Sequence, residues 1–514
     1  MKLFDSAFLS SLVQDFRKSM RNLLDDLCDD LEEHYPDHIV ALRLPVTYFR
    51  WVGRSLRQED YSGWKVVGWI EELNDLVYFI DLREQLRREK RPRQFAKELL
   101  AECTEQFYEN SYLDELFPQG EPESAGLARR LAGLSARLAR QVIQESLFLV
   151  PGLPCVWLEQ EGKRTWTVPM DFGPSFEQAE LSACIPFGLE GAYLAPPRTL
   201  QKFLSGRPKR ATMEVTREEM RIRAGGKVSA VYSSDRYPQW QWREVSLQWV
   251  RPASAAWPGG LALGPALIYG RDKTPSQVAP APSSVAPRLD RALTVIEAAW
   301  PEGYRNLVSL TTRIVPLNAH GVVSFSYRHR PGLSFINTFE RDGLDLIDDL
   351  VHENSHHHLN LLLRKYVMHR RDRNQEIFYS PWRHSLRPLR GILHATFTFT
   401  MGAILFERLS SWAESGHATL SKEQVLRARF RCLEEVASVD YSLRDLDYAG
   451  RKLGWVTGAG SALVRLLTRE LERVRKKIAP FEKVVLRSRH GTDLRRHRRE
   501  LWDARKTYGP VEKR

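Results

Sequence analysis

The sequence predicts a mixed α+β fold with a helical N-terminal region, a β-rich middle section and a mainly helical C-terminal domain. Three observations predict it. Apolar residues recur at three- and four-residue spacing over residues 1–150, short apolar runs separated by Pro and Gly fill residues 151–272, and helical spacing returns over residues 289–478. The chain has 514 residues, 43% of them hydrophobic and 27% charged, which suits about three globular domains and excludes wholesale disorder.

The N-terminal helices are predicted from an amphipathic pattern. Residues 127–148 combine this pattern with strong helix formers. The first helix carries its apolar face at Phe8, Leu12, Phe16, Met20, Leu23, Leu24 and Leu27. We interpret both segments as ordinary helical packing.

The middle section carries strand signals. Residues 213–234 are predicted to form two strands joined at Gly225 and Gly226. In residues 240–250, apolar side chains alternate with polar ones, and we interpret this stripe as the packed face of a sheet. Residues 273–288 are rich in Pro, Ser and Ala and are predicted to be a linker to the C-terminal domain.

The positive charge is concentrated at the C-terminus. Residues 473–514 hold 15 Lys or Arg against 5 Asp or Glu, a net charge of +10, whereas the whole chain carries +12. The remainder is nearly neutral and gives no reason to expect nucleic-acid binding. We expect residues 479–514 to be a basic, solvated tail.

Cysteine usage and hydropathy indicate a cytoplasmic protein without a membrane anchor. The five cysteines are widely spaced and form no CxxC pair, so a disulfide framework or a thiolate zinc site is not expected. Asp5 and Asp15 interrupt the apolar N-terminus, which argues against a signal peptide. No run approaches 18 uncharged apolar residues, so no membrane-spanning helix is expected. The sequence says nothing about the oligomeric state.

The strongest chemical signal is an HExxH motif formed by His352, Glu353 and His356. Leucines at helical spacing surround it, so the motif is predicted to lie on a helix, where the two imidazoles project from one face and can share a metal ion. Glu353 could then act as a general base toward a metal-bound water. Asp348 or Asp349 could hold the distal N–H of a ligating imidazole.

A third protein ligand is expected from a later helix. The pattern with a third His ten residues after the first is not met, because position 362 is Leu. We favour His394, which lies in an otherwise apolar run, over Glu407. The other histidines considered are His369 and His384.

Two further groups of residues accompany the motif. His357 and His358 are expected on the helix surface or beside the ligands rather than as ligands themselves. Arg383 and Arg387 lie in a loop punctuated by prolines, where a guanidinium group could bind a carboxylate through two hydrogen bonds.

Four strings in order resemble a bacterial family of HExxH-motif peptide modification proteins. They are residues 313–336, the motif helix at 348–363, the Tyr-x-Pro-Trp-Arg…Arg-Pro…Gly-x-x-His block at 378–399, and residues 453–467. The resemblance covers about a third of the chain, near residues 290–475. It departs from the family pattern after Pro-Trp-Arg, where family members usually carry acidic residues and this chain has His384, Ser385 and Leu386.

The resemblance implies an Fe(II)- and 2-oxoglutarate-dependent enzyme that hydroxylates a side-chain β-carbon in a ribosomally made peptide. It implies that His352 and His356 bind iron, with His394 as the third ligand, and that Arg383 or Arg387 binds a carboxylate of 2-oxoglutarate. The departure after Pro-Trp-Arg affects the expected substrate more than the expected metal binding.

Two other hypotheses remain open. A zinc metallopeptidase needs the same histidines and uses Glu353 as general base. Imidazole suits both iron and zinc, so the motif alone does not separate these enzymes. In a non-enzymatic protein the metal would be structural, and the basic tail would bind an acidic partner or nucleic acid.

Overall fold

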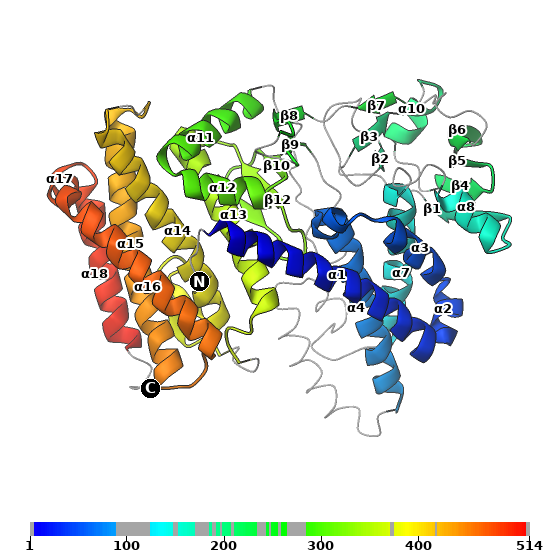
Figure 1. Ribbon diagram of the computed structural model, residues 1–514, viewed down its shortest axis with the longest axis horizontal. Helices are drawn as coiled ribbons and strands as arrows, with labels where there is room; N and C mark the ends of the chain where they lie inside the picture. The colour runs from blue at the N-terminus through cyan, green and yellow to red at the C-terminus, as the bar shows by residue number, and fades with distance from the viewer. Residues whose placement is uncertain are drawn as a thin grey trace.

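The computed structural model confirms a mixed α+β protein dominated by helices (Figure 1). It describes residues 5–88, 124–146, 153–169, 185–187, 192–195, 198–206, 210–233, 243–245, 248–254, 259–264, 284–370, 375–416 and 419–509. The helices from the two ends of the chain lie on opposite sides of the molecule, and strands occupy the region between and above them.

The N-terminal region folds as predicted where it is described. Helix α1 begins after Asp5, whose carboxylate accepts hydrogen bonds from the backbone N–H groups of Ala7 and Phe8 at 3.0 and 3.1 Å. Leu12, Phe16, Met20, Leu24 and Leu27 are buried, as the apolar spacing predicts. The other helices of this region are α2 (Pro36–Leu42), α3 (Val46–Ser55), η1 (Gln58–Ser62), α4 (Trp64–Arg88), α7 (Ser124–Ser146) and α8 (Leu153–Gln160), and α1 spans Ser6–His34.

Residues 213–234 form parts of three strands rather than the predicted two. β5 (Glu219–Ala224) and β6 (Lys227–Ser233) meet at Gly225 and Gly226, as predicted, with φ values of 54° and 75° that glycine adopts without strain. A second turn separates β4 (Thr212–Thr216) from β5. The Thr216 hydroxyl accepts a hydrogen bond from the backbone N–H of Glu219 at 3.1 Å and closes this turn. This side-chain turn has no Gly or Pro, which is why the sequence did not reveal it. With β1 (Thr165–Pro169), the sheet has the antiparallel order β1-β4-β5-β6.

A five-stranded sheet joins the middle section to the C-terminal domain, so the expected boundary at residues 273–288 does not separate their strands. Its order is β11-β12-β10-β9-β8, with β10 parallel to both β9 and β12. The strands are β8 (Gln248–Arg251), β9 (Leu261–Leu263), β10 (Arg313–Leu317), β11 (Phe325–Ser326) and β12 (Leu333–Asn337). Residues 273–283 of the expected linker lie outside the described residues, and α11 begins at Val285.

The predicted packed stripe at residues 240–250 is wrong at Trp249, the one stripe residue whose side chain is described. Trp249 on β8 is 40% exposed, whereas its neighbour Val250, on the opposite face of the strand, is buried. Trp240 and Trp242 lie outside the described residues. The remaining elements of the middle section are β2 (Ile185–Phe187), β3 (Ala192–Ala195), α10 (Arg198–Ser205) and β7 (Arg243–Val245), and β2, β3 and β7 form a separate sheet.

Long helices build the C-terminal domain around the central helix α14. The elements are α11 (Val285–Ala299), α12 (Pro301–Leu310), α13 (Gly343–Lys365), β13 (Phe378–Ser380), β14 (Ser385–Arg387), α14 (Leu389–Glu414), α15 (Lys422–Arg451) and α16 (Gly458–Ile478). α14 packs against α11, α13, α15 and α16. Among the described residues, α14 is the one helix that is both long enough and apolar enough to cross a membrane. Its apolar window is 72% buried inside the protein, as in the core helix of a folded domain.

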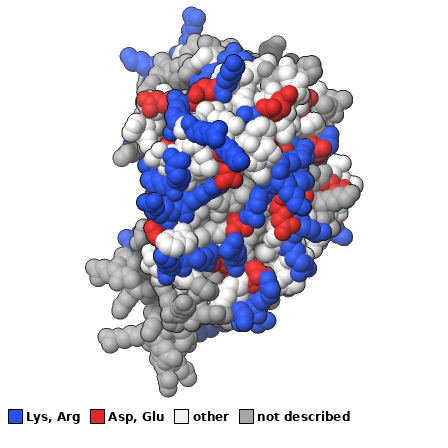
Figure 2. All heavy atoms as spheres, turned by 90° about the vertical axis from the view of Figure 1, so that its left-hand side faces the viewer, with Lys and Arg blue, Asp and Glu red and all other residues white. Residues whose placement is uncertain are grey.

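The basic C-terminal segment is folded, which corrects the expectation of a solvated tail. It forms η3 (Ala479–Phe481), α17 (Glu482–Arg487) and α18 (Gly491–Tyr508), and α18 packs on α15 and β13. Leu494 is fully buried, and Leu501 and Ala504 are 8% and 7% exposed, because these apolar positions recur at helical spacing. Figure 2 shows basic side chains crowding this side of the molecule, with acidic side chains dispersed among them.

Candidate metal centre

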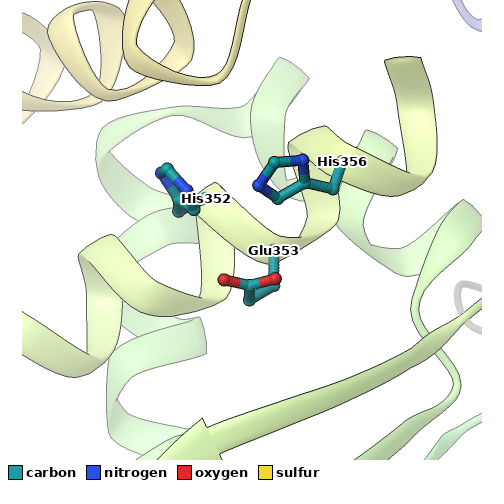
Figure 3. A group of neighbouring side chains, drawn as sticks. All are labelled: His352, Glu353 and His356. Carbon is teal, nitrogen blue, oxygen red and sulfur yellow. The ribbon is translucent and has the colours of Figure 1, made fainter. Parts of the chain in front are cut away.

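Helix α13 carries the HExxH motif in its third and fourth turns. The helix begins at a capping box, in which the Asp342 carboxylate accepts hydrogen bonds from the N–H groups of Leu344 and Asp345 at 2.8 and 3.0 Å. The ring centroids of His352 and His356 lie 5.0 Å apart (Figure 3). Two imidazoles that bind one ion at about 2.1 Å place their ring centres about 5 Å apart, so this pair already has the separation of two ligands.

Glu353 lies beneath the two imidazoles in Figure 3, on the side of a strand of the neighbouring sheet. One of its carboxylate oxygens lies within 4.8 Å of a ring nitrogen of both His352 and His356. The residue is 1% exposed, and Oε2 has no hydrogen-bond partner among the residues that the structure describes. Burial raises the pKa of Glu353 to about 8, although the nearby Ser326 hydroxyl on β11 opposes this rise. A buried carboxylate with an unsatisfied oxygen beside two imidazoles is the environment that a divalent cation would satisfy.

The structure brings His394 to this pair from the facing helix α14. Its ring centroid lies 6.2 Å from that of His356, with an angle of 31° between the ring planes. This separation exceeds that of two bound ligands by about 1 Å, which a small side-chain rotation covers. His394 is therefore near the motif, but it is not among the donor atoms that lie within 4.8 Å of one another, and its role as third ligand stays a prediction.

The three histidines have neutral rings at neutral pH, as metal ligands must. Burial lowers the pKa of His352, lowers that of His356 well below its ordinary value, and lowers that of His394 to about 4. All three side chains keep partial exposure. The three rings are therefore not sealed in the core.

His357 and His358 are buried, so the expectation of a helix-surface position is wrong, whereas a position beside the ligands stays a prediction. They are 3% and 2% exposed. His357 Nε2 lies 3.1 Å from the Ser334 hydroxyl on β12, and the His358 ring packs edge-on against Phe397 of α14 at 5.6 Å. The physical reason is that α13 is covered by the sheet on one side and by α14 on another.

Of the other candidates for the third ligand, Glu407 lies far along α14 from His394. Glu407 is thirteen residues beyond His394 on α14, about 20 Å along the helix axis. It is 1% exposed and lies 3.5 Å from Lys477 and 3.6 Å from Arg473, so its role is structural. His384 lies 3.2 Å from the Tyr379 hydroxyl. His369 pairs through its backbone with Val456, and its side chain lies within electrostatic range of His394.

Four arginines act electrostatically on His352 or His394. The positive charges of Arg431 and Arg383 lower the pKa of His352 further after burial, which places both guanidinium groups within electrostatic range of that ring. The charges of Arg328 and Arg390 act in the same way on His394. These four residues form what we call the cationic surround.

The sequence identified one member of the cationic surround, Arg383. The second predicted arginine, Arg387, has its side chain beside Gly391 near the start of α14, where its Nε would lie 3.6 Å from a Cβ added at that glycine. Arg390 could have been found from the sequence, because it lies four residues before His394 on one helix and so shares its face. Arg328 and Arg431 come from distant segments and carry no such signal.

The acidic residues before the motif bind arginine and serine rather than a ligating ring. Asp348 lies 3.1 Å from Arg431, and Asp349 accepts a hydrogen bond from the Ser324 hydroxyl at 2.9 Å. Burial raises the pKa of Asp349 to about 6. The negative charge of Asp348 nevertheless favours the protonated form of His352, so Asp348 acts on that ring electrostatically.

Aromatic packing connects the β13–β14 hairpin to the first motif histidine. The Trp382 ring stacks on Phe399 with centroids 4.3 Å apart and planes 7° apart, and Phe399 meets His352 edge-on at 4.9 Å. Trp382 Nε1 donates a hydrogen bond to Glu435 at 2.9 Å. The loop that contains Trp382 and Arg383 is therefore fixed against the candidate site.

No protein-family model matches this chain, and no curated protein is significantly similar to it. The family resemblance described from the four sequence strings consequently stays a hypothesis. The donor set itself fits a divalent transition metal, because it offers the two motif imidazoles and one buried carboxylate within 4.8 Å of one another, with a third imidazole, His394, 6.2 Å from His356 between ring centroids.

Proposed function

We propose that this chain is an Fe(II)- and 2-oxoglutarate-dependent enzyme that hydroxylates a side-chain β-carbon in a ribosomally made peptide. The observation that carries the proposal is the set of histidines on two facing helices, with ring centroids 5.0 Å apart for His352 and His356 and 6.2 Å apart for His356 and His394. The exposed Arg383 accompanies them on a loop that Trp382 and Phe399 connect to His352. A guanidinium group beside a metal can bind a carboxylate, and 2-oxoglutarate carries two.

The residues have distinct roles in this proposal. His352, His356 and His394 would hold the metal and leave coordination positions open for co-substrates. When bound, iron supplies the oxidising chemistry, in which 2-oxoglutarate and dioxygen yield succinate, carbon dioxide and one hydroxyl group on the peptide. Arg383 would bind the distal carboxylate of 2-oxoglutarate, because it is exposed and yet close enough to act on His352.

The resemblance left open whether Arg383 or Arg387 binds the carboxylate of 2-oxoglutarate, and the proposal assigns this role to Arg383. Arg387 packs against the start of α14, which supports Arg383 rather than Arg387 as the carboxylate ligand. The cytoplasmic location remains a prediction. Its support is that Cys28, Cys155 and Cys432, the cysteines within the described part of the chain, are free and buried.

A zinc metallopeptidase is the second candidate, and Glu353 is the observation that favours it. The Glu353 carboxylate lies within 4.8 Å of ring nitrogens of both motif histidines, close enough to accept a proton from a metal-bound water. A peptidase has no evident need for the exposed Arg383 on the loop that is fixed against His352, and we therefore rank it second.

The test is anaerobic purification and metal analysis, followed by measurement of succinate after addition of Fe(II), 2-oxoglutarate and dioxygen. We expect slow succinate formation without a peptide, and its loss in His352→Ala. His34→Ala is the matched control, because His34 is exposed on α1 and distant in sequence from the motif. Tightly bound zinc with no succinate formation would contradict the proposal and favour the peptidase.

A further inference from the structure

We propose that the C-terminal helix α18 positions the hairpin next to the metal site, and that Tyr508 is its principal positioning residue. The contact between α18 and the hairpin stands on its own geometry. Its expected consequence, a change in 2-oxoglutarate binding, rests on the proposed function. The basic segment would then contribute to the site instead of being an accessory tail.

The last residue of α18 packs directly on the first strand of the hairpin. The Tyr508 ring stacks on Tyr379 of β13, with centroids 5.1 Å apart and planes 13° apart. Tyr379 also meets Tyr441 of α15 at 5.8 Å, and the Arg505 guanidinium lies 3.6 Å above the Tyr441 ring. Arg505 is fixed in turn by an ion pair with Asp445 and a 2.8 Å hydrogen bond to the Tyr441 carbonyl oxygen. Tyr379 is thus held between two helices.

Tyr379 also contacts the turn at the end of the hairpin. Its hydroxyl lies 3.2 Å from Nδ1 of His384. His384 has a φ of 49°, a left-handed conformation that non-glycine residues adopt only when their surroundings stabilise it. The backbone N–H of His384 donates to the Ser380 carbonyl oxygen at 2.9 Å, which closes the turn around Trp382 and Arg383.

The turn is the part of the hairpin that reaches the candidate site. Trp382 stacks on Phe399, which contacts His352, and Arg383 lies within electrostatic range of the same ring. Contacts therefore run without interruption from Tyr508 through Tyr379 and the turn to the place where 2-oxoglutarate would bind. Loss of the Tyr508 ring frees one side of Tyr379 and lets the turn move.

Tyr508 is suited to a test because the fold of α18 does not depend on its ring. The helix is anchored by Leu494, Leu501 and Ala504, which are all buried farther from its end. Tyr508 itself is partly exposed and precedes Gly509, where the helix ends with a φ of 58°. Tyr508→Phe keeps the stacked ring, whereas Tyr508→Ala removes it.

The experiment compares these two variants with the wild type and with Trp502→Ala, which removes an aromatic ring that is 59% exposed on the same helix. The first readout is amide hydrogen exchange of residues 378–387 in the full, metal-free chain. We expect exchange about 10-fold faster in Tyr508→Ala, and wild-type exchange in Tyr508→Phe and Trp502→Ala. Unchanged exchange in Tyr508→Ala would overturn the proposal.

The second readout is steady-state succinate formation with Fe(II). We expect Tyr508→Ala to raise KM for 2-oxoglutarate several-fold with kcat and metal affinity unchanged, since the three histidines lie on other helices. Faster exchange with an unchanged KM would overturn the role of Tyr508 in the site. If the wild type forms no succinate, the proposed function fails, and hydrogen exchange still decides whether α18 holds the hairpin.

Discussion

Replacing His394 with Ala should remove the third ligand and weaken metal binding by more than about 100-fold. Substitution of residues that only support ligands lowers metal affinity about 10- to 100-fold, so loss of a ligand itself should lower it further. A 100-fold loss corresponds to about 2.8 kcal/mol of binding free energy. His394 qualifies because its ring lies 6.2 Å from that of His356 across the contact between α14 and α13.

Glu407→Gln is the matched control on the same helix. Its carboxylate is about 20 Å along the axis from His394 and pairs with Lys477 and Arg473, so the variant should keep the metal affinity and lower the melting temperature. Anaerobic competition with a chromophoric chelator would measure both affinities for Fe(II) and Zn(II). Wild-type affinity in His394→Ala, or a large loss in folded Glu407→Gln, would refute this ligand assignment.

Three further predictions follow from the site and its surroundings. Arg383→Gln should raise KM for 2-oxoglutarate by about 10- to 100-fold without a change in metal affinity, and Arg387→Gln should not; equal effects in a steady-state assay would contradict this assignment. Glu353→Gln should keep part of the uncoupled succinate formation, whereas complete loss together with peptide cleavage by the wild type would identify a peptidase. Burial raises the pKa of Glu435 to about 8, above its ordinary value of 4.5, so its contribution to folding stability is full below pH 4.5 and is lost as the pH rises to about 8. Glu435→Gln keeps an acceptor for Trp382, and its free energy of unfolding should rise by a few kcal/mol relative to the wild type between pH 5 and pH 8.5. Urea unfolding of both proteins across this pH range measures the difference, and a difference that does not change with pH would disprove the raised pKa.

Local patterns were enough to locate the motif helix and the facing histidine. The spacing of His352 and His356 is a property of one helix, and a polar residue in the apolar run around His394 is visible without any tertiary information. The arrangement of α1, including its buried face, also follows from a single period.

What the sequence could not reveal depends on contacts between distant segments. His357 and His358 look like surface residues until the sheet and α14 are placed on either side of α13. Arg431 reaches the site from α15, and Tyr508 reaches the hairpin from the end of the chain. The basic segment looked solvated because its many charges obscured three buried positions at helical spacing.

The central claim is that three histidines from two helices hold one metal ion, and anomalous diffraction from crystals of the metal-loaded chain tests it most directly. The account predicts one strong peak between α13 and α14, with ring nitrogens of His352, His356 and His394 at about 2.1 Å. A peak at another place, or a peak whose nearest protein atoms exclude His394, would contradict it.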